Sequence, residues 1–453
     1  MAERKTSEAA PGRHSHAIPA PSFPTHNSPR TWFLTQALSP LAVRLIRLLL
    51  AHGDYVVACL PPHELADDAC SAEFRALAQE CRAPAGRYAK DREGWKDRIR
   101  GIRCDGRAMG QCVAAVAEAV AVFGRIDIML CCRSEAVVGT LEEVVATGQS
   151  SGPDLVRDQF ETIFFSQVNF IKAALPQFRA QHTGHLIVLT SVGGHLGTPG
   201  LAVHTAATWA LEGYCDSLAY EIAPFNIRVT IVQPQTEVQT LTNRIVLAPP
   251  LPAYEAAALT TAAGAASSSA THAAYASDDP DGDPDGSPEP PAPRVRDMLT
   301  RVLNLHPASA VPPASAATAA SVAGTAAPAT PVVRYPRLPA AALDRLVLET
   351  VHALTAIGGH ENPPARHIVG FEASAAVQEK LKTVSEELED FVEASLAVDI
   401  FDSQLQAEVR AGRVAAQAEK AAQQVAQQTA AQQAAHQQQQ ATHAAADPQA
   451  TAE

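Results

Sequence analysis

The chain has 453 residues, of which 18% are charged and 47% apolar, and its formal net charge is −13 at pH 7. So acidic a balance offers no basic face for a phosphate backbone, and we expect no nucleic-acid partner. No run of 18 apolar residues occurs, so we expect no transmembrane helix. Much of the apolar share is alanine in low-complexity stretches, which predicts an ordered core smaller than the length suggests.

The first 30 residues are rich in Pro, Ser and His and contain no apolar signal-peptide core. They predict a disordered tail, although their basic, Ser-containing composition leaves a mitochondrial presequence open. The eight cysteines form no metal-type CxxC pair, and we identify no metal-ligand motif. We expect buried, reduced thiols and a cytoplasmic protein.

Strands and helices alternate along the first half of the chain. Residues 31–37 (TWFLTQA) predict a buried strand, and Ser39 predicts a helix cap with Pro40 at the first helical position, where proline is tolerated. Residues 108–123 predict a helix, and residues 158–181 a long helix that is interrupted or ends near Pro176. The other strands of this part are expected at residues 54–60, 99–104 and 126–132.

The same alternation continues up to the stretch of residues 247–333 and resumes near Tyr335. Strands are predicted at residues 185–191, 227–234 and 367–373, and helices at 203–223, 341–357 and 375–397. Near-continuous apolar strands alternating with helices indicate a parallel sheet covered on both faces. We therefore expect one doubly wound, Rossmann-like α/β domain with seven parallel strands, the last at residues 367–373.

Composition divides the chain into five parts. Between residues 247 and 333, Ala, Pro, Ser, Thr and Asp dominate, and such a segment buries too little apolar surface to offset its ordering entropy. We expect a disordered insertion there, and disordered segments of this kind suit a protein partner. The parts are a tail (1–30), a first core segment (31–246), the insertion (247–333), a second core segment (334–402) and an Ala/Gln-rich tail (403–453).

The most specific pattern lies in residues 184–221. A predicted strand ends in Ser191, a Gly/Pro loop follows, and the next helix opens with His204, 13 residues later, and Thr208 one turn on. The stretches GRIDIML (124–130), VVGTLEEV (137–144), FETIFFSQVNFIKAALPQF (160–178) and WALEGYCDSLAYEIAPFNIRVTIVQP (209–234) accompany it in a fixed order. With Asp105 after the third strand, they resemble the short-chain dehydrogenase/reductase superfamily. The resemblance runs from Trp32 to about Asp402, the insertion excluded, and it places residues 137–144 in a loop.

The resemblance implies roles for these side chains. In this family the Ser binds the substrate carbonyl, a Tyr donates the proton, and a Lys lowers the pKa of that Tyr. Ser191 holds the Ser position, while His204 and Thr208 stand where the Tyr and Lys would be. His204 is a candidate general acid that Thr208 would orient, and the plain alternative is a histidine at a helix start with no catalytic duty. Ile163 stands at the helix position of the catalytic Asn.

The family's phosphate loop, Thr-Gly-x-x-x-Gly-x-Gly, corresponds here to residues 35–42. Thr35 is retained, whereas Gln36, Pro40 and Ala42 replace the three glycines. Those glycines permit a tight turn, close approach of the pyrophosphate and close helix packing. Binding of NAD or NADP is therefore expected to be weak or absent.

The other cofactor-binding positions match the family's pattern only in part. The resemblance implies that Asp105 helps to position the adenine, and Cys131 begins the stretch CCRS where the family has Asn-Asn-Ala-Gly. After the second strand, residues 59–63 offer neither an acid for a ribose hydroxyl nor an arginine for a 2′-phosphate. The sequence therefore does not separate NAD from NADP.

Three functions follow from this pattern. The first is a catalytically degenerate oxidoreductase homologue acting as a binding or scaffold module, with low-complexity additions that resemble those of divergent fungal reductase-like proteins. The second is an active NAD(P)-dependent oxidoreductase for a carbonyl or hydroxyl substrate, with a non-standard Ser191/His204 site. The third is a hydrolase with a Ser191–His204 pair, for which no matching acid is evident.

The resemblance also implies a homodimer. In this family the dimer face is formed by the helices that correspond to residues 158–181 and 203–223. Four large apolar side chains of these helices are expected to cover that face or the sheet: Phe164, Phe165, Phe170 and Trp209.

Overall fold

The chain consists of two compact units, residues 1–381 and 382–453. The computed structural model describes residues 20–83, 90–132, 135–149, 154–249, 333–334, 338–397 and 411–412. The predicted insertion and Ala/Gln-rich tail lie almost wholly outside these ranges. Among the helices within them, none combines the length and apolarity of a membrane span.

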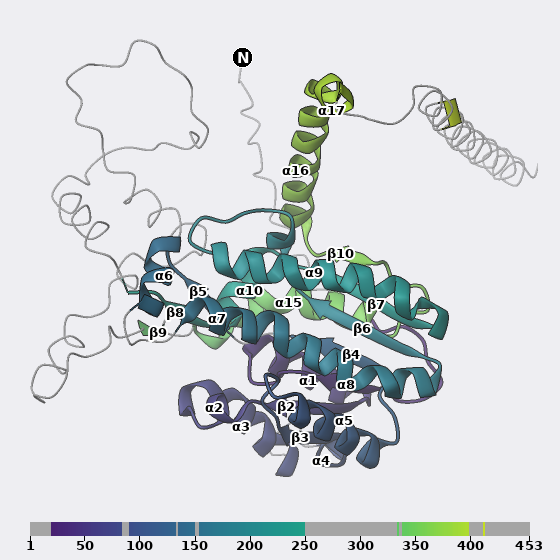
Figure 1. Ribbon diagram of the computed structural model, residues 1–453. Helices are drawn as coiled ribbons and strands as arrows, with labels where there is room; N and C mark the ends of the chain where they lie inside the picture. The colour runs from purple at the N-terminus through teal and green to yellow at the C-terminus, as the bar shows by residue number, and fades with distance from the viewer. Residues whose placement is uncertain are drawn as a thin grey trace, which may run out of the picture. The chain divides into compact units, whose positions relative to one another are not determined.

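A seven-stranded sheet forms the centre of the first unit, with the strand order β10-β7-β6-β4-β1-β2-β3. All its strand pairs are parallel, and the chain reverses its direction of travel across the sheet between β3 and β4 (Figure 1). This is the doubly wound order, and it confirms the predicted Rossmann-like fold. The strands are β1 (Thr31–Leu34), β2 (Tyr55–Leu60), β3 (Ile99–Arg103), β4 (Ile128–Cys131), β6 (Gly184–Leu189), β7 (Ile227–Gln233) and β10 (Arg366–Ile368).

Helices cover both faces of this sheet, since successive strand residues point to opposite sides. Trp32 and Leu34 join one apolar cluster with helices α1 and α15, while Phe33 joins another with α5, α8 and α9. In Figure 1, α8 and α9 lie in front of the sheet and α15 behind it. The helices of the first unit are α1 (Pro40–His52), α2 (Pro62–Leu65), α3 (Asp68–Arg82), α4 (Trp95–Arg98), α5 (Met109–Phe123), α6 (Leu141–Gln149), α7 (Leu155–Phe160), α8 (Ser166–Gln181), α9 (Ala202–Ile222), α10 (Thr236–Thr242) and α15 (Ala340–Ile357). Helix α16 (Phe371–Asp390) crosses the boundary between the units, and α17 (Val392–Ala397) belongs to the second unit.

A second sheet of three strands was not predicted. Strand β5 (Glu135–Val138) pairs in parallel with β8 (Arg244–Leu247), which pairs antiparallel with β9 (Val333–Arg334). An ion pair between Arg244 and Glu135 joins β8 to β5. Residues 137–144 are therefore not a loop throughout, because they contain the end of β5 and the start of α6.

Two predicted boundaries were wrong. The last strand ends at Ile368 rather than residue 373, because Gly370 adopts a positive φ of 92° and α16 begins at Phe371. The helix predicted over residues 158–181 neither breaks nor ends at Pro176, which lies inside α8. Pro176 and Lys172 are both exposed, so water can bond the carbonyl that the proline leaves without a partner. The irregularity is instead a π-helical turn over Glu161–Phe165.

The side chains considered for a dimer face divide into two groups. Phe170 is buried against the sheet, and Phe164 packs against the same cluster. Phe165 and Trp209 are 46% and 52% exposed. Homodimer formation stays a prediction.

All eight cysteines are free and buried, as predicted. Burial also raises the pKa of the Cys131 and Cys215 thiols. These cysteines therefore contribute as small apolar side chains.

Candidate functional site

The carboxyl ends of β1, β2, β3, β4 and β6 meet at one edge of the sheet, and the predicted site residues follow these strands. At the end of β1, Thr35 Oγ1 donates to Gln167 Oε1 (2.8 Å) and accepts from the backbone N–H of Cys132 (3.0 Å). Helix α1 then begins as predicted, with Ser39 Oγ accepting from the N–H of Ala42 (3.2 Å) and Pro40 at the first helical position. Thr35 thereby joins β1, β4 and α8.

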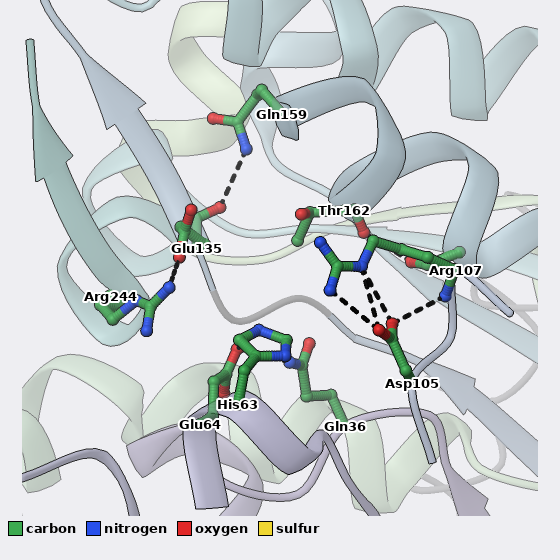
Figure 2. Close-up of polar contacts among 10 residues, drawn as sticks. Gln36, His63, Glu64, Asp105, Arg107, Glu135, Gln159, Thr162 and Arg244 are labelled. Atoms are coloured by element: carbon green, nitrogen blue, oxygen red, sulfur yellow. Dashed lines mark hydrogen bonds and ion pairs between the residues drawn. The ribbon is translucent and has the colours of Figure 1, made fainter. Parts of the chain in front are cut away.

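Gln36 stands at the position of the first glycine of the family's phosphate loop, and its side chain is buried. Its Nε2 donates to Glu64 Oε1 (2.9 Å), and the two residues are 7% and 3% exposed. A cavity of about 30 Å³ lies beside them, which is room for about one water molecule. Figure 2 shows Gln36, His63 and Glu64 on one side of this space and Asp105, Arg107 and Thr162 on the other.

Glu64 was missed by sequence reasoning. It lies in α2, just after β2, where doubly wound dinucleotide-binding proteins place an acid for the ribose 2′-hydroxyl. Glu64 directly follows residues 59–63, which contain no acid, and nothing in the sequence shows that α2 turns Glu64 back toward Gln36. The signal available was the acid's position about 20 residues after the phosphate loop at residues 35–42.

Asp105 lies after β3 and is paired with Arg107. The guanidinium contacts both carboxylate oxygens, with Nη2 at 2.8 Å from Oδ2 and Nε at 3.0 Å from Oδ1. Hydrogen bonding to Arg107 lowers the pKa of Asp105, and the same bond raises the pKa of Arg107. The adenine position inferred for Asp105 therefore contains a fixed ion pair whose arginine also lines the cavity.

Ser191 lies two residues after β6 and caps a short 3-10 turn, Val192–Gly194. Its Oγ accepts from the N–H of Gly193 (3.1 Å), and the residue is fully buried. That bond uses an acceptor lone pair and leaves the hydroxyl proton able to donate, as binding of a carbonyl oxygen requires.

His204 and Thr208 lie one turn apart at the start of α9. They are 1% and 0% exposed, and Thr208 Oγ1 donates to the backbone carbonyl of His204 (2.9 Å). This is a common bond of threonine inside a helix. The roles inferred for Ser191, His204 and Thr208 stay predictions.

Ile163, at the position of the family's catalytic Asn, is fully buried inside the π-helical turn. Such turns often occur at functional sites. The turn is present although the polar side chain is not.

The strand and helix order and the Ser191 region agree with the comparison to known families. A family model described as short chain dehydrogenase matches residues 63–245. The chain belongs to the short-chain dehydrogenase/reductase superfamily. The match begins after the altered loop of residues 35–42, whose three glycines are replaced.

Relatives of this superfamily member include named oxidoreductases. The chain is 27% identical over 205 residues to "Oxidoreductase BOA17" of Botryotinia fuckeliana, covering 45% of this chain and 65% of the relative. It is 37% identical over 120 residues to "3-ketodihydrosphingosine reductase" of Bacteroides thetaiotaomicron, covering 26% and 42%. It is 30% identical over 131 residues to "Retinol dehydrogenase 8" of Homo sapiens, covering 29% and 38%. The matches thus span less than two thirds of these relatives' lengths.

The fold of a solved short-chain dehydrogenase from Streptomyces avermitilis is similar. The TM-score is 0.50 at 21% identity, over 82% of this chain and all of the other. This likeness supports the fold alone. Neither it nor the named relatives support the binding or scaffold role that the altered motifs favoured.

A buried polar chain beside Ser191 was also missed. His195 Nε2 lies 3.1 Å from Gln233 Oε1, and Gln233 Nε2 donates to both carboxylate oxygens of Glu212 (3.1 and 3.0 Å). Glu212 is 3% exposed and also lies 3.6 Å from Arg366 Nη2. These hydrogen-bonded side chains link the loop after Ser191 to α9, β7 and β10, so they fix the position of that loop.

We expect Glu212→Ala to lower the free energy of unfolding by about 1–3 kcal/mol, because the buried amide of Gln233 loses its acceptor. Urea unfolding followed by circular dichroism measures this. Glu221→Ala, at an exposed position of the same helix, is the matched control and should change stability little. Equal losses in both variants would show that the polar chain contributes nothing.

Proposed function

We propose that this protein is an oxidoreductase of the short-chain type, acting on a carbonyl or hydroxyl substrate with Ser191 and His204 in its active site. The observation that carries the proposal is the placement of Ser191 after β6 and His204 at the start of α9, within a family whose named relatives are reductases and dehydrogenases. A hydrolase has no comparable support.

We further propose NAD rather than NADP as the cofactor. Glu64 is positioned to accept from a ribose hydroxyl, and its negative charge would repel a 2′-phosphate. Asp105 and Thr35 line the same cavity and would hold the remainder of the adenosine half. A bound nicotinamide would supply or accept the hydride.

Fit to a dinucleotide requires Gln36 to separate from Glu64, because the cavity beside these two residues admits about one water molecule. A hydrogen bond to a buried carboxylate contributes about 1.5–3 kcal/mol. Its loss on binding would weaken affinity about tenfold or more. The polar groups of this site are therefore suited to NAD, while the hydrogen bond between Gln36 and Glu64 makes binding weak.

The proposed chemistry of the chain's own residues is simple. The Ser191 hydroxyl donates to the substrate carbonyl oxygen, and the His204 imidazolium delivers the proton that this oxygen takes up on reduction. A protonated imidazole can act as a general acid by itself, so this donor needs no lysine like the one that assists the family's tyrosine.

Gln36→Gly tests the cofactor part of the proposal. We expect it to tighten NADH binding about tenfold, because it removes the bond to Glu64 and restores close approach of the backbone. NADH fluorescence titration measures the dissociation constant. Gln36→Leu also removes the hydrogen bond but keeps the bulk of the side chain, so its NADH affinity should lie between those of wild type and Gln36→Gly.

The second candidate function is a binding module without turnover, and the closed Gln36–Glu64 contact favours it. It requires that wild-type protein and Gln36→Gly both fail to bind NADH at millimolar concentration. NADH binding by Gln36→Gly alone would show a cofactor site closed by one side chain.

A further inference from the structure

Residues 20–30, predicted as part of the disordered tail, pack against the core of the first unit next to the start of β2. Phe23 packs against the apolar cluster of α1 and stacks on the ring of His52, with centroids 3.7 Å apart and planes 6° from parallel. Arg30 Nη1 donates to the carbonyl of Gly358 (2.7 Å). This N-terminal strap (residues 20–30) is therefore tied to the core at both ends.

The strap brings His26 to two residues at the end of α1. His52 is the last residue of that helix, and Gly53 ends it in the left-handed conformation with a φ of 108°. The turn at Gly53 places Asp54 beside His52, with His52 Nδ1 3.3 Å from Asp54 Oδ2. His26 Nε2 lies 3.9 Å from Asp54 Oδ1.

We propose that His26, His52 and Asp54 form a binding site for a zinc ion that fastens the N-terminal strap to the core. One ligand atom from each residue lies within 4.8 Å of the other two. In a tetrahedral zinc site with bonds of about 2.0–2.1 Å, ligand atoms are about 3.4 Å apart. A closure of about 1–1.5 Å therefore completes the geometry.

The surroundings hold the ligands in a state suited to a metal. His26 Nδ1 contacts the carbonyl oxygen of Ser28 (2.5 Å), which makes Nδ1 the protonated nitrogen and leaves the Nε2 lone pair toward Asp54. Asp54 Oδ1 accepts from the N–H of Arg30 (3.0 Å), and Oδ2 accepts from Trp32 Nε1 (3.3 Å). Each oxygen keeps a second lone pair for the ion.

Electrostatics and space also favour a cation. The site lies at the carboxyl end of α1, where the helix dipole is negative, and Asp54 is 1% exposed. An open hollow of about 350 Å³ is lined by the strap together with His52, Gly53 and Asp54, so an ion can reach the ligands and keep a water in its fourth position. The positive charge of Arg30 acts on Asp54 and offsets part of this attraction.

The donor set selects the metal. Two imidazole nitrogens and one carboxylate suit zinc, whereas magnesium and calcium prefer oxygen ligands throughout. The strap contacts α1 through this cluster and through the apolar packing of Phe23. Zinc would therefore act as a structural fastening of the strap.

The test uses untagged, full-length protein freed of metal by a chelator. Calorimetric titration with zinc should give one ion per chain, and cobalt should give the ligand-field absorption of a tetrahedral site. Loss of an outer-shell partner typically weakens a metal site about 10–100-fold, so His26→Ala, which removes a ligand from the strap, should weaken zinc binding about 100-fold or more. Asp54→Asn should weaken it while retaining the acceptor for Trp32.

His182→Asn is the matched control, because His182 is an exposed histidine in a left-handed conformation that asparagine tolerates. It should bind zinc like wild type. A double variant, His14→Ala with His16→Ala, tests the two histidines that precede the strap in the sequence. Zinc affinity that is unchanged in His26→Ala, or lost in the double variant alone, would overturn the proposal.

Discussion

His204→Ala is expected to lower kcat/KM for carbonyl reduction by about 10²–10⁴, the usual contribution of a general acid. The reason is that His204 holds the position of the proton donor at the start of α9, directly after the loop that carries Ser191. NADH oxidation with a panel of ketones and aldehydes measures the change. His204→Gln keeps the size and polarity of the side chain without an acidic proton, so it should show nearly the same loss.

The pH profile separates proton donation from a structural role. If the imidazolium is the donor, the reduction rate should fall as pH rises through the pKa of the donor, and this limb should vanish in His204→Gln. Tyr214→Phe, in the same helix, is the control and should keep wild-type activity, because Tyr214 packs against the core.

Two results would contradict this assignment. Unchanged activity in His204→Ala would exclude His204 as the donor. Absence of turnover in wild-type protein together with Gln36→Gly would favour the binding module, since the cofactor site is then open and the catalytic groups still do nothing.

The main sheet could be predicted because each of its strands has a signal in its own short stretch of sequence. Buried strands such as β4 and β6 are near-continuous apolar runs, and the Ser39–Pro40 helix start has its own side-chain signal. The end of the last strand could not be predicted in this way. The break after Ile368 depends on the positive φ of Gly370, which is not visible in an apolar run.

The second sheet could not be predicted in this way. Strand β8 pairs with β5, 109 residues earlier at Arg244 and Glu135, and with β9 beyond a long low-complexity stretch. Strand propensity depends strongly on such tertiary neighbours. A four-residue strand with distant partners has too weak a sequence pattern to be predicted by itself.

The residues of the candidate site also divide into those that a local sequence pattern predicts and those that only the fold brings together. Ser191 and His204 were predicted from their spacing along the chain, and their roles stay predictions, whereas Glu64 and the Glu212–Gln233 pair are defined by contacts across the fold. His26 and Asp54 were missed for the same reason: they lie 28 residues apart in sequence and meet only where the strap crosses the end of α1.

Acidification from pH 7 to pH 5 is expected to lower the free energy of unfolding by about 2 kcal/mol through His185 alone. His185 lies in β6 and is 1% exposed. Its Nδ1 accepts from the N–H of Gly359 (3.0 Å), so Nε2 carries the proton and donates to Thr230 Oγ1 (3.0 Å). Burial, with the nearby charge of Arg228, lowers the pKa of His185 to about 3.

Acid lowers the stability because the unfolded chain binds a proton on His185 more readily than the folded chain does. Between pH 6.5 and pH 3 the unfolded chain holds a proton on this imidazole and the folded chain does not, so stability is full above about pH 6.5 and falls as the pH is lowered toward 3. Urea unfolding at pH 7 and pH 5, with a chelator present so that metal binding does not contribute, measures the drop. His185→Gln should be less stable at pH 7 but lose about 2 kcal/mol less between the two pH values, whereas the exposed-site variant His182→Asn should keep the wild-type drop. An equal drop in His185→Gln and wild type would show that His185 is not the group that resists protonation in the folded protein.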